Sequence, residues 1–196
     1  DEAAALEMVR RPEPVAAQEP ARPDHALADE APPRIERDRL RAGDLDAYRA
    51  SLARPSEHIA QAVDQLLPCA PDAIVLGHSI DTFRGGVAGA RQLQAELEAH
   101  GKGARMILPA LSFLRALQTL EVGRRIAVLT PYWPPGDEQV EAFFSVAGYT
   151  TTRVIGLKCA GPLAIASTPA AQLKSALQEL AGERPDAIVQ PGTNLA

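Results

Sequence analysis

The sequence has little cysteine, and this limits the sites it can build. Two of its 196 residues are cysteine, Cys69 and Cys159, and they lie far apart in the chain. They are too few and too distant for a disulfide framework, a CxxC pair or a zinc site. We therefore predict no metal site, and we expect both side chains to be free thiols, buried or half-buried.

Long apolar runs and basic stripes are also missing. No run approaches the roughly 20 apolar residues of a membrane span, and the Asp1-Glu2 start does not open a secretory signal, so we expect no membrane partner and a cytoplasmic location. Arginines are scattered among acidic residues at a net charge of -5, so we expect no nucleic-acid partner. No GxGxxG, Walker A or HExxH pattern occurs, which argues against dinucleotide, nucleotide and zinc-hydrolase chemistry.

The first 54 residues carry no recognisable chemistry. Residues 12–33 are rich in Pro, Ala, Glu and Arg, a composition that buries little apolar surface, so we expect irregular structure there. Residues 35–48 suit a solvated helix or an extended connection. The chain begins without Met and stops soon after an apolar strand-like run, and we expect it to be incomplete at both ends.

From Pro55 onwards, strand-like and helix-like segments alternate. Strands are predicted at 73–76, 106–108, 126–129, 151–155 and 187–189, and helices at 57–67, 87–100, 111–120, 137–147 and 169–181. Ser56 is the predicted cap of the first of these helices. The first strand, Ala73-Ile74-Val75-Leu76, is an unbroken apolar run and is predicted to be buried on both faces. The alternation predicts a doubly wound α/β fold with parallel strands.

Ligands of open parallel sheets bind beyond the carboxyl ends of the strands. The loops at those ends, 77–86, 130–136 and 190–194, are dense in hydroxyls, amides and glycine. Glycine lets backbone N–H groups approach a ligand, and hydroxyl and amide donors can surround a carboxylate without a metal. These loops therefore suit a carboxylate or an enediolate.

Structural roles are open for the same residues. Serine and threonine after a strand often bond to their own backbone in a turn. Tyr132, between prolines, could be a packed loop aromatic, and His78 is either a general acid/base or a structural histidine. Asp81 suits a helix cap or a loop-pinning carboxylate. Gly85-Gly86 could offer N–H groups to an anion, although two glycines alone are a weak signal.

Three segments carry a resemblance to a known family. These are Leu76-Gly77-His78-Ser79 with Phe83-Arg84-Gly85 behind it, Ile126-Ala127-Val128-Leu129-Thr130-Pro131-Tyr132, and Ile188-Val189-Gln190-Pro191-Gly192-Thr193-Asn194-Leu195. In this order they resemble the active-site segments of the aspartate/glutamate racemase superfamily, in its branch of maleate cis-trans isomerases and arylmalonate decarboxylases. The resemblance runs from about Pro55 to Ala196.

The resemblance implies two pseudo-symmetric α/β halves with the active site between them. We accordingly divide the chain into residues 1–54, part of the first half, residues 55–130, which carry the first active-site loop, and residues 131–196, a truncated second half. The resemblance further implies a reaction without cofactor or metal and a small dicarboxylic acid as substrate. Relatives often pair through helices on the outer face of the sheet, which leaves a homo-oligomer open.

The resemblance also implies roles for individual residues. Hydroxyl groups of Ser79, Tyr132 and Thr193 would donate to the substrate carboxylate or to the developing enediolate, where most of the rate enhancement should arise. The predicted catalytic residues are Tyr132, Ser79 and His78. The predicted substrate-binding residues are Gly77, Thr130, Gly192, Thr193 and Asn194.

The sequence departs from the family at both cysteine positions, which fall on Gly77 and Gly192. In the decarboxylases a cysteine protonates the carbanion left by carbon dioxide, and in the isomerases a cysteine adds to the double bond. Glycine at 77 agrees with the decarboxylases, which makes an arylmalonate decarboxylase-like enzyme the leading hypothesis, with His78 as a substitute acid. The alternatives are a maleate isomerase-like enzyme, a non-catalytic carboxylate-binding relative, and a hydrolase that pairs His78 with Ser79.

Overall fold

A computed structural model describes residues 42–53 and 57–195. The predictions for residues 1–41 and the helix cap at Ser56 lie outside this part of the chain. The helices are α1 (Ala42–Ala53), α2 (Glu57–Leu66), α3 (Gly86–His100), α4 (Pro109–Thr119), α5 (Pro134–Val146), α6 (Pro162–Ala166) and α7 (Ala170–Gly182), with 3-10 turns η2 (Leu67–Cys69) and η3 (Ile80–Phe83). The strands are β1 (Ala73–Val75), β2 (Arg105–Ile107), β3 (Arg125–Thr130), β4 (Thr150–Gly156) and β5 (Ala187–Val189).

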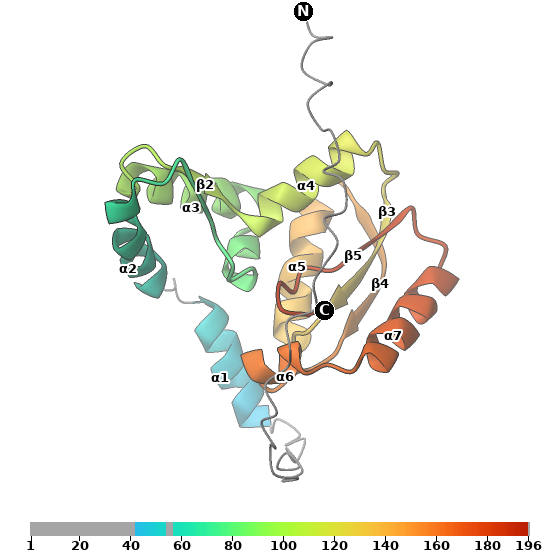
Figure 1. Cartoon of the computed structure of the whole chain (residues 1–196). Helices are drawn as coiled ribbons and strands as arrows, with labels where there is room; N and C mark the ends of the chain where they lie inside the picture. The colour runs from blue at the N-terminus through green and yellow to red at the C-terminus, as the bar shows by residue number, and fades with distance from the viewer. Residues whose placement is uncertain (1–41, 54–56, 196) are drawn as a thin grey trace, which may run out of the picture. The chain divides into compact units, whose positions relative to one another are not determined.

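The larger sheet has the parallel order β4-β3-β5. Side chains of β3 alternate between its two faces: Ile126 and Val128 join the cluster that contains Phe143 of α5, whereas Ala127 and Leu129 join the cluster that contains Leu180 of α7. Helix α5 thus covers one face and α7 the other (Figure 1). A strand buried on both faces reads as a continuous apolar run, and all of β3 after Arg125 is buried. The predicted parallel α/β fold is confirmed.

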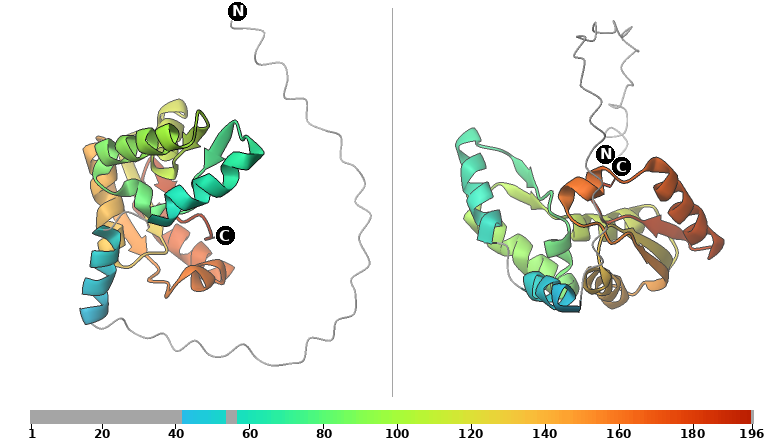
Figure 2. Two further views of the ribbon diagram at one scale, coloured as in Figure 1. Left: turned by 90° about the vertical axis from the view of Figure 1, so that its left-hand side faces the viewer. Right: turned by 90° about the horizontal axis from the view of Figure 1, so that it is seen from below.

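The smaller sheet pairs β1 with β2 in parallel. Its covered face holds Ile74 and Met106, which pack with Val63 of α2 and Leu97 of α3. Figure 2 gives two further views of the ribbons of these strands and helices. The opposite face carries Val75, which is 67% exposed, and Ile107, which is 38% exposed. The prediction that this strand is buried on both faces is therefore wrong. An apolar run is compatible with two covered faces but does not require them, and both packed helices lie on the same side.

The predicted strands and long helices all occur, with bounds shifted by up to three residues. Residues 42–48 form the first part of α1, so the helix holds there and the extended connection does not. Helix α6 and turn η3 were not predicted, because each is too short to show a helical period. Cys69 is exposed, so its expected burial is wrong, whereas Cys159 is half-buried as expected. Within 42–53 and 57–195, no helix has both the length and the apolarity needed to cross a membrane.

Candidate functional site

The loops that follow β1, β3 and β5 meet at a pair of hydroxyl groups. Ser79 Oγ and Tyr132 OH lie 2.7 Å apart, although the residues are far apart in the chain. Both hydroxyls also lie within hydrogen-bond distance of the Pro191 carbonyl oxygen, at 3.0 Å for Tyr132. The two side chains are buried, with Ser79 4% and Tyr132 8% exposed. The fold thus brings together one residue from each of the three predicted loops.

These contacts cannot all be satisfied at once. Each hydroxyl has one hydrogen to donate, whereas the Ser79–Tyr132–Pro191 triangle has three edges. Either Ser79 or Tyr132 donates to the carbonyl while the other donates to its neighbour. Burial raises the pKa of Tyr132 to about 12, against a lowering by the Ser79 hydrogen bond. Tyr132 therefore stays protonated at neutral pH and acts as a donor.

A second contact ties the first and third loops together. Thr193 Oγ1 donates to the Gly77 carbonyl oxygen over 2.7 Å. Thr193 and Asn194 are exposed, as is Gly77, whereas Gly192 is buried. Together with the Ser79–Pro191 hydrogen bond, this contact holds residues 77–79 beside residues 191–193.

His78 forms a pair with Asp81. Its Nδ1 lies 2.9 Å from Asp81 Oδ2, and the histidine side chain is 67% exposed while that of Asp81 is 8% exposed. The hydrogen bond to Asp81 raises the pKa of His78, partly offset by desolvation. A carboxylate on Nδ1 fixes the ring and leaves Nε2 as the nitrogen for proton exchange. Since the Ser79 hydroxyl bonds to Tyr132 and Pro191 instead, the geometry does not support the hydrolase alternative.

Thr130 is placed differently from the expectation that it binds substrate. It is fully buried; its hydroxyl donates to Asp137 Oδ1 and accepts from the Tyr132 N–H over 3.0 Å. Thr130 therefore supports the Tyr132 loop and offers no surface to a ligand. Asp137 was not among the predicted residues. Its sequence signal is weak, because an acidic residue in the first turn of a helix is common.

An apolar cavity of about 420 Å³ opens beside the third loop. Its walls include Val75, Ile107 and Phe113, together with residues 190–193. The uncovered face of the small sheet thus forms part of a wall close to Gly192 and Thr193. No group of three or more His, Cys, Asp or Glu that could hold a metal ion occurs in the described ranges.

The two glycines that the sequence resemblance aligns with cysteines, Gly77 and Gly192, differ in their surroundings. A Cβ added at Gly77 meets no atom within 4 Å, whereas one at Gly192 would lie 2.8 Å from Pro131 Cδ. Cys159 does not replace them: its N–H donates to Pro131 O over 2.9 Å, but its thiol lies 3.8 Å from Thr168 Oγ1.

These surroundings give different expectations for a cysteine introduced at each position. Gly77→Cys should change the free energy of unfolding by less than about 0.5 kcal/mol, because the site is open and on the surface. Gly192→Cys should lower it by about 1–3 kcal/mol through overpacking against the proline ring. Urea denaturation of both variants checks this, and equal stability would contradict the steric argument.

The described chain is thus a parallel α/β fold whose hydroxyl-rich loops meet at the carboxyl ends of β1, β3 and β5. Solved structures that share this fold are maleate cis-trans isomerases and arylmalonate decarboxylases. The resemblance predicted from the motifs is confirmed at the level of the fold.

Three structures illustrate the likeness. A mutant of the maleate cis-trans isomerase from Nocardia farcinica with a covalently bound succinylcysteine intermediate is 21% identical, with a TM-score of 0.66 over 80% of this chain and 63% of that one. The maleate isomerase Iso from Pseudomonas putida is 20% identical, with a TM-score of 0.68 over 76% and 61%. An arylmalonate decarboxylase is 21% identical, with a TM-score of 0.59 over 76% and 63%.

The chain matches a little over 60% of the length of these proteins. By sequence, no family model and no curated protein matches it.

Proposed function

We propose that the protein is a cofactor-independent lyase or isomerase that acts on a small dicarboxylic acid through an enediolate intermediate, with decarboxylation of the arylmalonate type as the leading reaction. The observation that carries this proposal is the Ser79–Tyr132 hydroxyl pair, 2.7 Å apart, at the meeting point of three strand-end loops. The proposal includes two pseudo-symmetric halves, 55–130 and 131–196, with the reaction between them.

The hydroxyl pair supplies the electrostatic part of the mechanism. As carbon dioxide leaves, the electrons of the broken C–C bond pass into the remaining carboxylate, which becomes an enediolate. The Ser79 and Tyr132 hydroxyls, one of which donates to the Pro191 carbonyl and the other to its neighbour, turn to this oxygen, and Thr193 supports them from the third loop. Donors fixed in a buried site stabilise such charge far better than water does, and the pKa of Tyr132, at about 12, keeps its proton in place.

The second step needs a proton on the carbon that lost carbon dioxide. No thiol stands at position 77 or 192, so we assign this role to His78, oriented by Asp81. Nε2–H of the imidazolium gives its proton to the enediolate carbon, and the neutral ring regains one from water. His78 follows Gly77, whose carbonyl oxygen accepts a hydrogen bond from Thr193. The imidazole is therefore carried by the loop that is bonded to the residue next to Gly192.

Glycine at both cysteine positions also bears on the alternatives. A maleate isomerase of the known type needs a nucleophile that adds to the double bond, and the absence of a thiol at 77 and 192 weighs against that reaction. The same absence favours a non-catalytic carboxylate-binding relative as the second candidate.

Proton NMR in deuterated buffer tests the proposal with maleate, an arylmalonate and aspartate as candidate substrates. Loss of carbon dioxide, isomerisation or deuterium incorporation would each leave a distinct spectrum. Conversion of one acid is the expected result. If all three stay unchanged while one raises the melting temperature of the protein, the binding-protein candidate replaces the enzyme.

A further inference from the structure

We infer that Asp137 is a positioning residue for Tyr132, acting through Thr130, and that its charge sets the order of the Tyr132 loop. The inference deepens the proposed function and rests on it only for the role of Tyr132 in turnover. The structural link stands on its own contacts: Asp137 Oδ1 accepts from Thr130 Oγ1, which accepts from the Tyr132 N–H.

Several elements close in on the Asp137 carboxylate. Thr130 reaches it from the end of β3, and Gly156 at the end of β4 lies so close that an added Cβ would clash with Oδ2. Tyr48 of α1 and Lys158 of the loop after β4 interact with it electrostatically. On α5 itself the neighbouring charges are Glu138 and Glu141, which disfavour its ionisation.

Ionisation of Asp137 decides the direction of the relay. A carboxylate only accepts, so the Thr130 hydroxyl must donate to it, and the lone pairs of Thr130 remain directed at the Tyr132 N–H. A protonated Asp137 can donate instead, and the Thr130 hydroxyl is then free to turn. Burial raises the pKa of Asp137 to about 6, partly offset by the Thr130 hydrogen bond and by Lys158. Asp137 should therefore change its protonation state near pH 6.

The raised pKa of Asp137 also affects stability, and its effect on stability is opposite to its effect on activity. A carboxyl group whose pKa is raised by folding stabilises the protein less once it is ionised, so its contribution falls as pH rises from about 4 to about 6. Asp137→Asn removes that cost at neutral pH while it removes the fixed acceptor. We therefore expect the stability of Asp137→Asn, measured relative to the wild type, to increase as pH rises. We also expect this variant to turn over more slowly than the wild type.

Tyrosine-selective ¹³C NMR reads the relay without any substrate. The chain has three tyrosines, and Tyr149, bonded to none of the relay residues in the contacts above, serves as the reference signal. The Tyr132 resonance should titrate with a midpoint near pH 6 in the wild type and lose that titration in Asp137→Asn. In Thr130→Val the Tyr132 titration should lose most of its amplitude, because the substitution breaks the relay and keeps the charge of Asp137.

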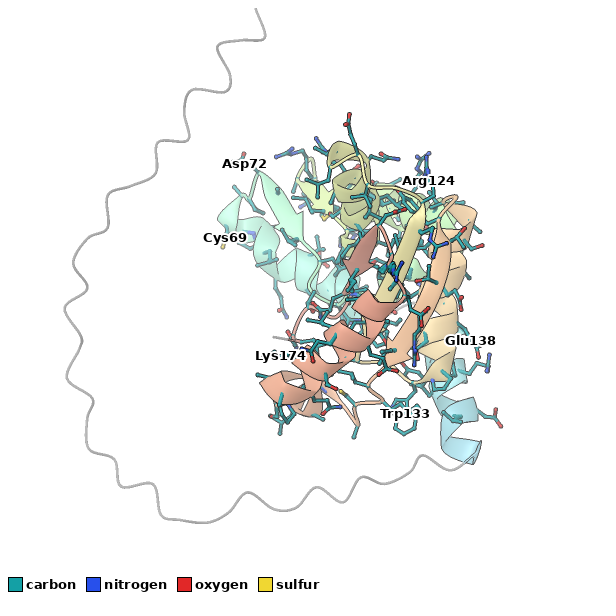
Figure 3. All side chains as sticks on the ribbon, turned by 90° about the vertical axis from the view of Figure 1, so that its right-hand side faces the viewer. Cys69, Asp72, Arg124, Trp133, Glu138 and Lys174 are labelled. Atoms are coloured by element: carbon teal, nitrogen blue, oxygen red, sulfur yellow. The ribbon has the colours of Figure 1, made fainter. Side chains whose placement is uncertain are left out.

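Glu138→Gln is the matched control, a carboxylate-to-amide change at the next residue of α5. Glu138 lies on the surface (Figure 3) and forms an ion pair with Arg49, so the Tyr132 titration should persist. The melting temperature of Asp137→Asn minus that of the wild type should be larger at pH 7 than at pH 4.5. In an active protein, kcat should fall about tenfold with KM little changed, as for loss of an interaction made in the transition state.

A Tyr132 resonance that titrates identically in Asp137→Asn and the wild type would overturn the inference. So would a melting-temperature difference that is the same at both pH values. Failure of the proposed function would appear separately, as absent turnover in the wild type with the Tyr132 titration intact.

Discussion

Tyr132→Phe should lower turnover about 100- to 1000-fold, the loss that follows removal of one donor to a developing oxyanion. The substitution removes a hydroxyl and keeps the ring, which packs in the main core cluster. Ser79 retains the Pro191 carbonyl as a partner, so the loop should remain folded. The loss should therefore appear in kcat, with the melting temperature nearly unchanged.

Tyr149→Phe provides the control for this result. Tyr149 is also buried, and it packs edge-on against Phe144 and under the Arg124 guanidinium. It directly precedes β4, so it lies at the end of the parallel sheet opposite to the loops that follow β3 and β5. It should keep full activity in the NMR assay that reports decarboxylation. Equal activity of the Tyr132 and Tyr149 variants would remove Tyr132 from the mechanism.

His78→Asn should lower turnover about 100- to 10,000-fold, the range for loss of a general acid, and leave binding of the substrate in place. The protonated imidazole is the active form. Because the hydrogen bond to Asp81 raises the pKa of His78, wild-type activity should decline as pH rises through that raised value. Asparagine can still bond to Asp81 but has no proton to give.

The matching control is His100→Asn. His100 also pairs with a carboxylate, Asp64, at 2.9 Å, but on the surface between α3 and α2. Its variant should retain turnover and the alkaline decline of the wild type. If the His78 variant keeps both as well, another group supplies the proton. Ligand-induced shifts of the melting temperature separate lost binding from lost chemistry.

The order of helices and strands was predictable because periodicity is local. Ile126 to Leu129 is an apolar run short enough for a strand and buried on both faces, and the sequence alone shows it. The same type of apolar run gave a wrong prediction for the strand that contains Val75, which is covered on one face only. Whether the second face of a strand is covered depends on helices elsewhere in the chain, and both α2 and α3 pack against the Ile74 side.

The candidate site divides in the same way. Position at a strand end identified Ser79, Tyr132 and the third loop, since parallel strands direct their carboxyl ends to one edge. The hydrogen-bond partners of these residues could not be predicted from the sequence. They are the Pro191 carbonyl, which both hydroxyls share as an acceptor, and Asp137, which accepts from Thr130. A hydrogen bond between distant segments leaves no periodic trace in the sequence.

The triangle of Ser79, Tyr132 and Pro191 makes ligand binding an exchange of acceptors. In this structure both hydroxyls already lie within hydrogen-bond distance of the Pro191 carbonyl oxygen. A ligand therefore gains binding free energy here only to the extent that it is a better hydrogen-bond acceptor than this carbonyl. A neutral ester or amide offers an acceptor much like the carbonyl it displaces. An ionised carboxylate forms hydrogen bonds roughly twice as strong. The protein can therefore select ionised acids over their neutral derivatives without a cationic side chain at the point of contact.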